Sequence, residues 1–137
     1  MPLLEQVLEN NPDTVKISLK NMPLRFHKYA NPAARAALAA EKQGKFWEFH
    51  DELFAIAPDL DPEAITGIAT KLGLDLEKFQ QDMESDEIAE KVEKDLSDAQ
   101  DAGVTGTPTI FVNGIKLKNR TLEAIQKLID EELAKKD

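Results

Sequence analysis

Few side chains in this chain of 137 residues are of the types that perform chemistry. The sequence contains two histidines, His27 and His50, and no cysteine. These residues therefore provide no thiol nucleophile, no structural disulfide and no thiolate metal ligand. Because zinc sites are built mainly from cysteines and histidines, two histidines alone do not favour one. We expect no bound metal and no other cofactor.

The remaining polar candidates are each explained by local structure. His50 lies on the apolar stripe of a predicted helix and is interpreted as a core histidine that is hydrogen-bonded locally. Trp47 and the phenylalanines near it are expected in the core rather than around a ligand. The tripeptide Asp61-Pro62-Glu63 is typical of a helix start rather than a cation site. The acidic run 84–93 is interleaved with apolar residues at helical spacing, which indicates a solvated helix face.

Composition restricts the class of partner. The length is that of one domain, and 42% apolar with 31% charged residues is typical of a globular chain. The net charge of -9 argues against nucleic acid, because phosphate contacts need clustered Lys and Arg, and equally against an anionic membrane surface. No apolar run approaches the roughly 20 residues of a transmembrane helix. Residues 1–10 carry no basic residue, so we do not interpret them as a signal peptide.

Periodicity predicts the order helix, strand, helical block, two strands, helix. Residues 1–8 place their leucines and valine on one helical stripe, and residues 15–19 alternate apolar and polar side chains as a half-exposed strand does. From about 27 to 102 every segment has a helical period. The predicted helix caps in this block are Asn31, Asp61, Asp75 and Ser85.

The last third of the chain contains the clearest turn signal. Residues 109–112 and 115–118 flank Asn113-Gly114, a dipeptide that favours a tight hairpin because both central residues of a type I′ turn need positive φ. Residues 110–112 are apolar throughout, which predicts a strand buried on both faces, whereas 115–117 alternate like an edge strand. Thr121 is the predicted cap of the final helix.

Five segments, taken together and in order, resemble the DsbA-like disulfide oxidoreductases, especially their compact bacterial branch. These segments are residues 3–6, 21–27, 44–51, 71–75 and 103–114. The resemblance implies an α/β, thioredoxin-like (DsbA-like) fold with a helical insertion, in a single domain over residues 1–137. The insertion covers approximately residues 27–102.

Members of that family carry a strand ending in a Cys-x-x-Cys motif directly before the helix that begins near Met1 here. The present chain contains no such segment. The strand pattern fits a thioredoxin-like sheet lacking the first central β-strand, and it also fits a genuine three-stranded sheet. The resemblance therefore implies a truncated, redox-inactive piece of a periplasmic or otherwise extracytoplasmic enzyme that performs disulfide exchange on protein substrates. The location of this chain itself is left open.

The resemblance also implies the site residues. Thr107 and Pro108 correspond to the family's substrate-binding loop, where a cis peptide bond lets the threonine backbone pair with an extended peptide. The interpretation from the residues alone is a trans proline at the first position of a strand. His27 follows the predicted strand in a segment near the family's active-site face and is a candidate site-adjacent residue. No catalytic residue is assigned, because the cysteine pair is absent.

Two other functions are consistent with the same residues. One is a redox-inactive thioredoxin-like module that binds peptides or proteins along the loop that contains Thr107 and Pro108, called the proline loop below. The other is a glutathione-conjugating relative, which would need a serine in the missing N-terminal segment. If the central strand is missing, the backbone of residues 15–19 and 109–112 is left without a partner strand. Since open sheet edges recruit other chains, we expect dimerisation, strand exchange or low stability.

Overall fold

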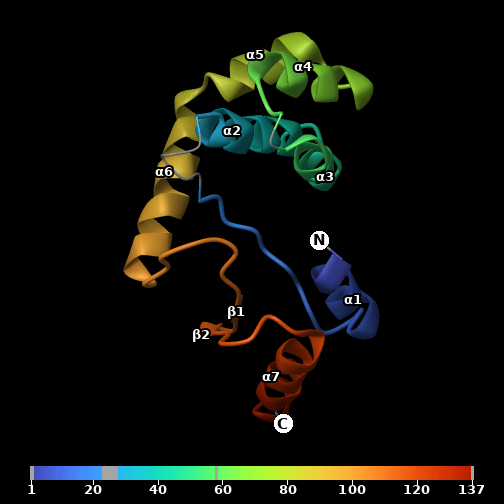
Figure 1. Cartoon of the computed structure of the whole chain (residues 1–137), viewed down its shortest axis with the longest axis vertical. Helices are drawn as coiled ribbons and strands as arrows, with labels where there is room; N and C mark the ends of the chain where they lie inside the picture. Colours follow the sequence, from blue (N-terminus) through green and yellow to red (C-terminus); the bar gives the residue numbers. More distant parts are fainter. Residues whose placement is uncertain (1, 23–27, 58, 137) are drawn as a thin grey trace. The chain divides into compact units, whose positions relative to one another are not determined.

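The computed structural model describes residues 2–22, 28–57 and 59–136, and the chain divides into two compact units. The first, which we call the hairpin unit, consists of Met1–Leu19 and Val104–Asp137. The second, the helical unit, is Lys20–Gly103. Figure 1 shows the elements of both units.

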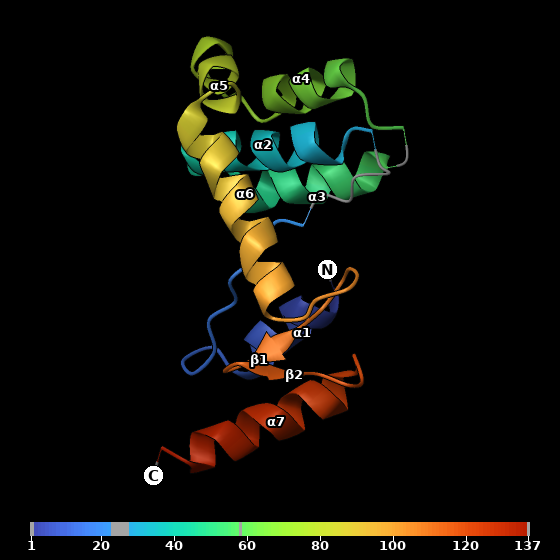
Figure 2. The same ribbon diagram turned by 90° about the vertical axis from the view of Figure 1, so that its left-hand side faces the viewer.

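The helical unit is built from consecutive helices joined by short turns. Their bounds are α2 Ala30–Glu41, α3 Phe46–Ile56, α4 Pro62–Lys71, α5 Leu76–Met83 and α6 Asp86–Asp101. Helix α2 contacts the other four, which lie around it in Figure 2. Its alanines at positions 36, 37, 39 and 40 are almost completely buried, and small side chains allow neighbouring helices to approach closely. The alanine-rich composition of α2 therefore explains its central position.

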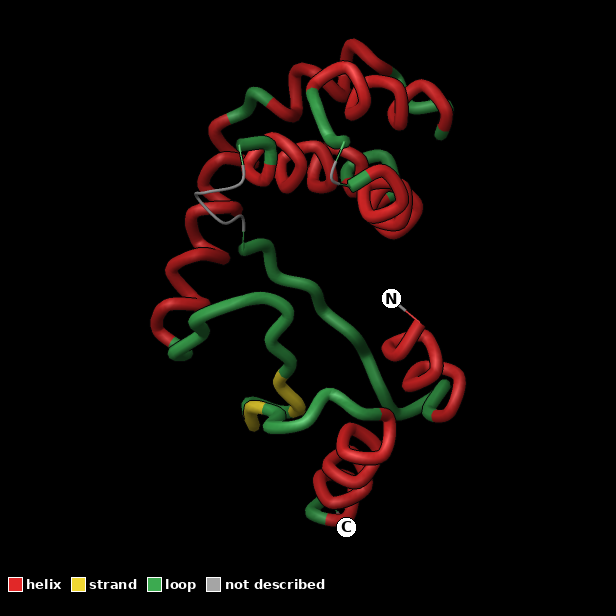
Figure 3. The backbone as a smooth tube through the Cα atoms, viewed as in Figure 1, coloured by secondary structure: helices red, strands yellow, loops and turns green. Residues whose placement is uncertain are grey.

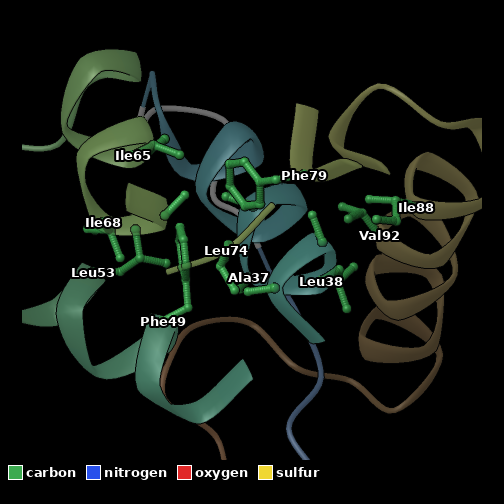
Figure 4. Packing of buried hydrophobic residues seen from close by; sticks show 14 residues of the cluster. Ala37, Leu38, Phe49, Leu53, Ile65, Ile68, Leu74, Phe79, Ile88 and Val92 are labelled. Atoms are coloured by element: carbon green, nitrogen blue, oxygen red, sulfur yellow. The ribbon is translucent and has the colours of Figure 1, made fainter. Parts of the chain in front are cut away.

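Large apolar side chains from the surrounding helices fill the space beside α2 (Figure 4). The rings of Phe49 in α3 and Phe79 in α5 are fully buried, with centroids 5.5 Å apart. Ile65 and Ile68 of α4 and Val92 of α6 belong to the same cluster. The helical unit thus has a hydrophobic core of its own.

Helix caps were the most accurate local predictions. The side chains of Asp61, Asp75, Ser85 and Thr121 each accept a hydrogen bond from the backbone N–H three residues later. The predicted cap at Asn31 was wrong, because α2 already begins at Ala30, after Tyr29. Asn31 instead lies in the first turn, where its Oδ1 accepts a hydrogen bond of 2.8 Å from Nε of Arg35.

The hairpin unit contains α1 Pro2–Asn10, β1 Phe111–Val112, β2 Ile115–Lys116 and α7 Leu122–Ala134. The strands are antiparallel, with Phe111 opposite Lys116, and their turn has the predicted conformation. Asn113 and Gly114 have φ values of 48° and 83°. Val7 of α1 and Ile125 and Ile129 of α7 form the core, against which one face of the hairpin packs.

The sheet is smaller than predicted. Residues 15–19 were expected to form a strand, but Figure 3 shows them as loop, and no strand pairs with them among the described residues. Their burial still alternates as expected, and Val15 packs on the core of the hairpin unit. A strand requires a partner for its backbone N–H and C=O groups. The predicted alternation of buried and exposed side chains was therefore correct, but the predicted strand over residues 15–19 was wrong.

The predicted burial of residues 110–112 on both faces was also wrong. Ile110 and Val112 pack on the α1–α7 cluster, but Phe111, between them, is 37% exposed. Successive side chains of a strand point to opposite faces, and helices α1 and α7 cover only one face of this hairpin. A run of apolar residues is therefore not sufficient evidence of burial on both faces.

Candidate peptide-binding groove

The loop before β1 presents an exposed stretch of backbone. Thr107 and Pro108 are both exposed, and the peptide bond between them is cis. Thr109 fixes the loop locally, because its Oγ1 donates a hydrogen bond of 2.6 Å to the carbonyl oxygen of Gly106. Within the described residues, the backbone N–H and C=O of Thr107 make no hydrogen bond. The loop therefore offers one free donor and one free acceptor to an extended chain.

Pro108 forms part of a groove of about 590 Å³ in the hairpin unit. The first turn of α1 contributes Pro2, Leu3 and Leu4, and Ile110 extends the apolar surface from the proline loop. Residues 118–121, which connect β2 to α7, form the remaining side. Apolar residues next to free backbone groups can contact an apolar side chain of an extended peptide while the backbone groups pair with its main chain.

Local sequence explains how these segments are positioned. Leu3 and Ile110 face the core formed by Val7, Ile125 and Ile129, so packing holds α1 and the proline loop on the same cluster. The connection from β2 to α7 ends at Thr121, whose side chain accepts from the N–H of Ala124 at 3.1 Å. This cap determines where the connection turns into the helix.

Arg120 links two sides of the groove. Its Nη1 donates a hydrogen bond of 3.3 Å to the carbonyl oxygen of Pro108. A guanidinium has five N–H donors, so most of them stay available. Lys118 also lines the groove and has no hydrogen-bond or ion-pair partner in the part of the chain that the structure describes. Two cations thus border an apolar groove in a chain whose net charge is -9.

Of the candidate residues named from the sequence, Pro108 lines the groove and Thr107 directly precedes it. His27 lies outside the described residues. His50 lies in the helical unit and is buried, as expected. Its expected local hydrogen bond is not formed with any described residue, since Nδ1 has no hydrogen-bond partner among them and only approaches Oδ1 of Asp51 at 3.5 Å.

The expectation that Trp47 and its neighbouring phenylalanines form core was only partly correct. Phe49 is fully buried, but Trp47 is 45% and Phe54 is 65% exposed, and both rings contact His50. Helix α3 carries two apolar stripes, because Phe49 and Leu53 face the core whereas residues 47, 50 and 54 follow a separate helical spacing. The apolar pattern of α3 was therefore interpreted as one buried face, whereas it combines a buried face with a more exposed one.

Sequence reasoning missed Leu3, Leu4, Lys118 and Arg120 as groove residues. The groove brings residues 2–4 together with residues 108–121, and no local pattern in the sequence predicts a contact between segments so far apart. One signal was available: residues 116–120 contain three basic residues in a strongly acidic chain. In the described residues no group of three or more His, Asp or Glu is close enough together to hold a metal ion, and no helix is long and apolar enough to cross a membrane.

Comparison with known proteins gives consistent results for the fold. Residues 4–130 match the family described as DSBA-like thioredoxin domain. A thioredoxin-like oxidoreductase from Silicibacter pomeroyi superposes with a TM-score of 0.77 at 27% identity, covering 100% of this chain and 78% of that one. The oxidoreductase DsbA from Xylella fastidiosa has the same fold, with a TM-score of 0.73 at 22% identity, covering 97% and 79%.

The curated relatives are of a different kind. The Na(+)/H(+) antiporter NhaA of Herminiimonas arsenicoxydans is 38% identical over 117 residues, which are 82% of this chain but 18% of the antiporter. The chain thus spans less than a fifth of the length of the curated relatives that it matches.

Proposed function

The chain belongs to the family of DSBA-like thioredoxin domains. We propose that it supplies the peptide-binding part of a disulfide-exchange unit. The chain itself would perform no thiol chemistry. The parent unit would exchange disulfides in protein substrates in the periplasm. The observation that carries the proposal is the unpaired backbone of Thr107 beside an apolar groove, in a chain without cysteine.

The proposed binding mode follows from the free groups of the loop. An extended peptide would pair with the N–H and C=O of Thr107, as in addition of a strand to a sheet edge. One of its apolar side chains would lie on Leu4 and Ile110, which gives affinity by removing apolar surface from water. Disulfide exchange itself needs an attacking thiolate and a mixed disulfide, for which residues 1–137 hold no group.

The test combines a redox assay with a binding assay on residues 1–137. We expect catalysed reduction of insulin no faster than a buffer blank, together with measurable binding of a cysteine-free extended peptide that contains one leucine. Leu4→Asp should weaken this binding about tenfold or more, because a carboxylate replaces the apolar contact. Disulfide reduction above the blank, or peptide binding unaffected by Leu4→Asp, would contradict the proposal.

Leu8→Asp is the matched control for Leu4→Asp. Leu8 lies on the same helix, is 39% exposed and does not line the groove. The same charge is thus introduced into α1 at a position where the proposal predicts no loss of peptide binding. Equal losses in the two variants would indicate damage to α1 rather than to the groove.

A second candidate function is favoured by the curated relatives. Because antiporters match over less than a fifth of their length, the chain would be a redox-inactive binding module within a longer ion-transport protein. The intact mass and N-terminal sequence of the native protein decide between the two. A Cys-x-x-Cys segment shortly before Met1 supports the disulfide-exchange unit, and a much longer polypeptide without that pair supports the binding module.

A further inference from the structure

The groove beside the proline loop is asymmetric in charge. Its apolar lining comes from the first turn of α1 and from Ile110, and its charged lining consists of Lys118 and Arg120 in the connection between β2 and α7. None of the described residues that line it is acidic, although the whole chain has 26 acidic and 17 basic residues. Glu123, the acid in the first turn of α7, does not line the groove.

Both cations are available to a ligand. Lys118 is exposed and unpaired among the described residues, unlike Lys71, Lys94 and Lys135, whose ammonium groups are bound by nearby carboxylates. Arg120 uses one of its N–H groups to donate a hydrogen bond to the carbonyl oxygen of Pro108. This bond orients the guanidinium at the proline loop. Its remaining N–H groups can bind a carboxylate through two parallel hydrogen bonds.

From this geometry we infer that the groove selects extended peptides in which an acidic residue accompanies an apolar one. Side chains on one face of an extended peptide recur every second residue, so the acid should lie two positions from the apolar residue. The apolar side chain contacts Leu4 and Ile110, and the carboxylate contacts Lys118 and Arg120. This inference rests on the proposed function, because it names the substrate class of the same groove.

The test uses three peptides with an N-terminal dansyl group that differ at one position, with sequences of the form Gly-Ser-Leu-Thr-X-Thr-Gly and X as Glu, Gln or Lys. We expect residues 1–137 to bind the Glu peptide about 3- to 10-fold more tightly than the Gln peptide at about 20 mM salt, the effect of two exposed cations. The preference should disappear at about 0.5 M salt, where exposed charges are screened.

Charge reversal gives the decisive comparison. The double variant Lys118→Glu with Arg120→Glu should prefer the Lys peptide to the Glu peptide. Lys127→Glu is the matched control, because Lys127 is exposed on α7 and does not line the groove. It should leave the order of the three peptides unchanged. Arg120→Lys should lose part of the preference, since an ammonium cannot form the two parallel bonds.

The outcomes separate this inference from the proposed function. Equal affinities for the three peptides, with binding still lost in Leu4→Asp, would overturn the acidic preference and leave the peptide-binding groove intact. Absence of binding by all three peptides would overturn both. A preference for the Glu peptide that Lys127→Glu abolishes as strongly as the double reversal would also overturn the inference, because it would reflect overall charge.

Discussion

Asp95 of α6 is a fully buried carboxylate in the helical unit. Its Oδ2 accepts from the backbone N–H of Asn21 at 2.9 Å and from Nδ2 of Asn21 at 3.1 Å, and Nζ of Lys91 donates to Oδ1 at 2.8 Å. Burial acts to raise the pKa of Asp95, but the hydrogen bonds from Lys91 and Asn21 outweigh it and lower the pKa. The ionised form therefore ties the segment before α2 to α6.

This lowered pKa predicts how stability depends on pH. A carboxyl group with a lower pKa in the folded state stabilises that state above its unfolded pKa of about 3.9. The contribution is lost as the pH falls through the folded pKa. We expect Asp95→Asn to reduce the free energy of unfolding by about 2 kcal/mol at neutral pH and by less below pH 4. Urea unfolding at several pH values measures this.

Glu93→Gln provides the control for Asp95→Asn, since Glu93 is an exposed residue of the same helix with no partner among the described residues. We expect it to change the free energy of unfolding by less than about 0.5 kcal/mol. A similar loss in both variants, or a loss at Asp95 that does not shrink at acidic pH, would refute the role given to the Asp95 carboxylate.

Sequence patterns within a few residues correctly predicted those parts of the helices and turns that neighbouring residues stabilise. The caps at Asp61, Asp75, Ser85 and Thr121 and the turn at Asn113-Gly114 depend on neighbours within three residues, and the structure confirms them. The strand over residues 15–19 depends on a distant partner, and the periodicity of its side chains cannot report whether that partner exists. The groove depends on a contact between residues 2–4 and 108–121, so only Thr107 and Pro108 were predicted from the sequence, through the family resemblance.

The unpaired segment 15–19 leads to a prediction about association. Its backbone faces no partner strand in the described part of the chain, and such edges pair with other chains. We propose that residues 1–137 dimerise through this segment at high concentration. Sedimentation equilibrium should show a mass that rises with concentration, and Ser18→Pro should reduce the rise because proline removes one donor.

Lys16→Ser serves as the comparison for Ser18→Pro, because it changes an exposed side chain of the same segment and keeps every backbone donor. It should associate like the unchanged chain. A monomer at all concentrations, or equal association of the unchanged chain and Ser18→Pro, would contradict pairing through residues 15–19.

At the scale of the whole molecule, each unit carries its own core. The helical unit buries Phe49 and Phe79 beside the alanines of α2, and the hairpin unit packs α1 against α7. The groove lies entirely within the hairpin unit. Peptide binding can therefore be examined at defined positions of that unit, with the helical unit as an internal reference.

An amide NMR titration of residues 1–137 with a cysteine-free extended peptide shows directly whether the loop at Thr107 and Pro108 binds peptides. We predict that the resonances of Thr107, Ile110 and residues 118–121 shift in a saturable way, while those of α4 and α5 stay unchanged. Saturable shifts confined to the helical unit, or no shift at Thr107 at millimolar peptide, would show that the proline loop is not the binding site.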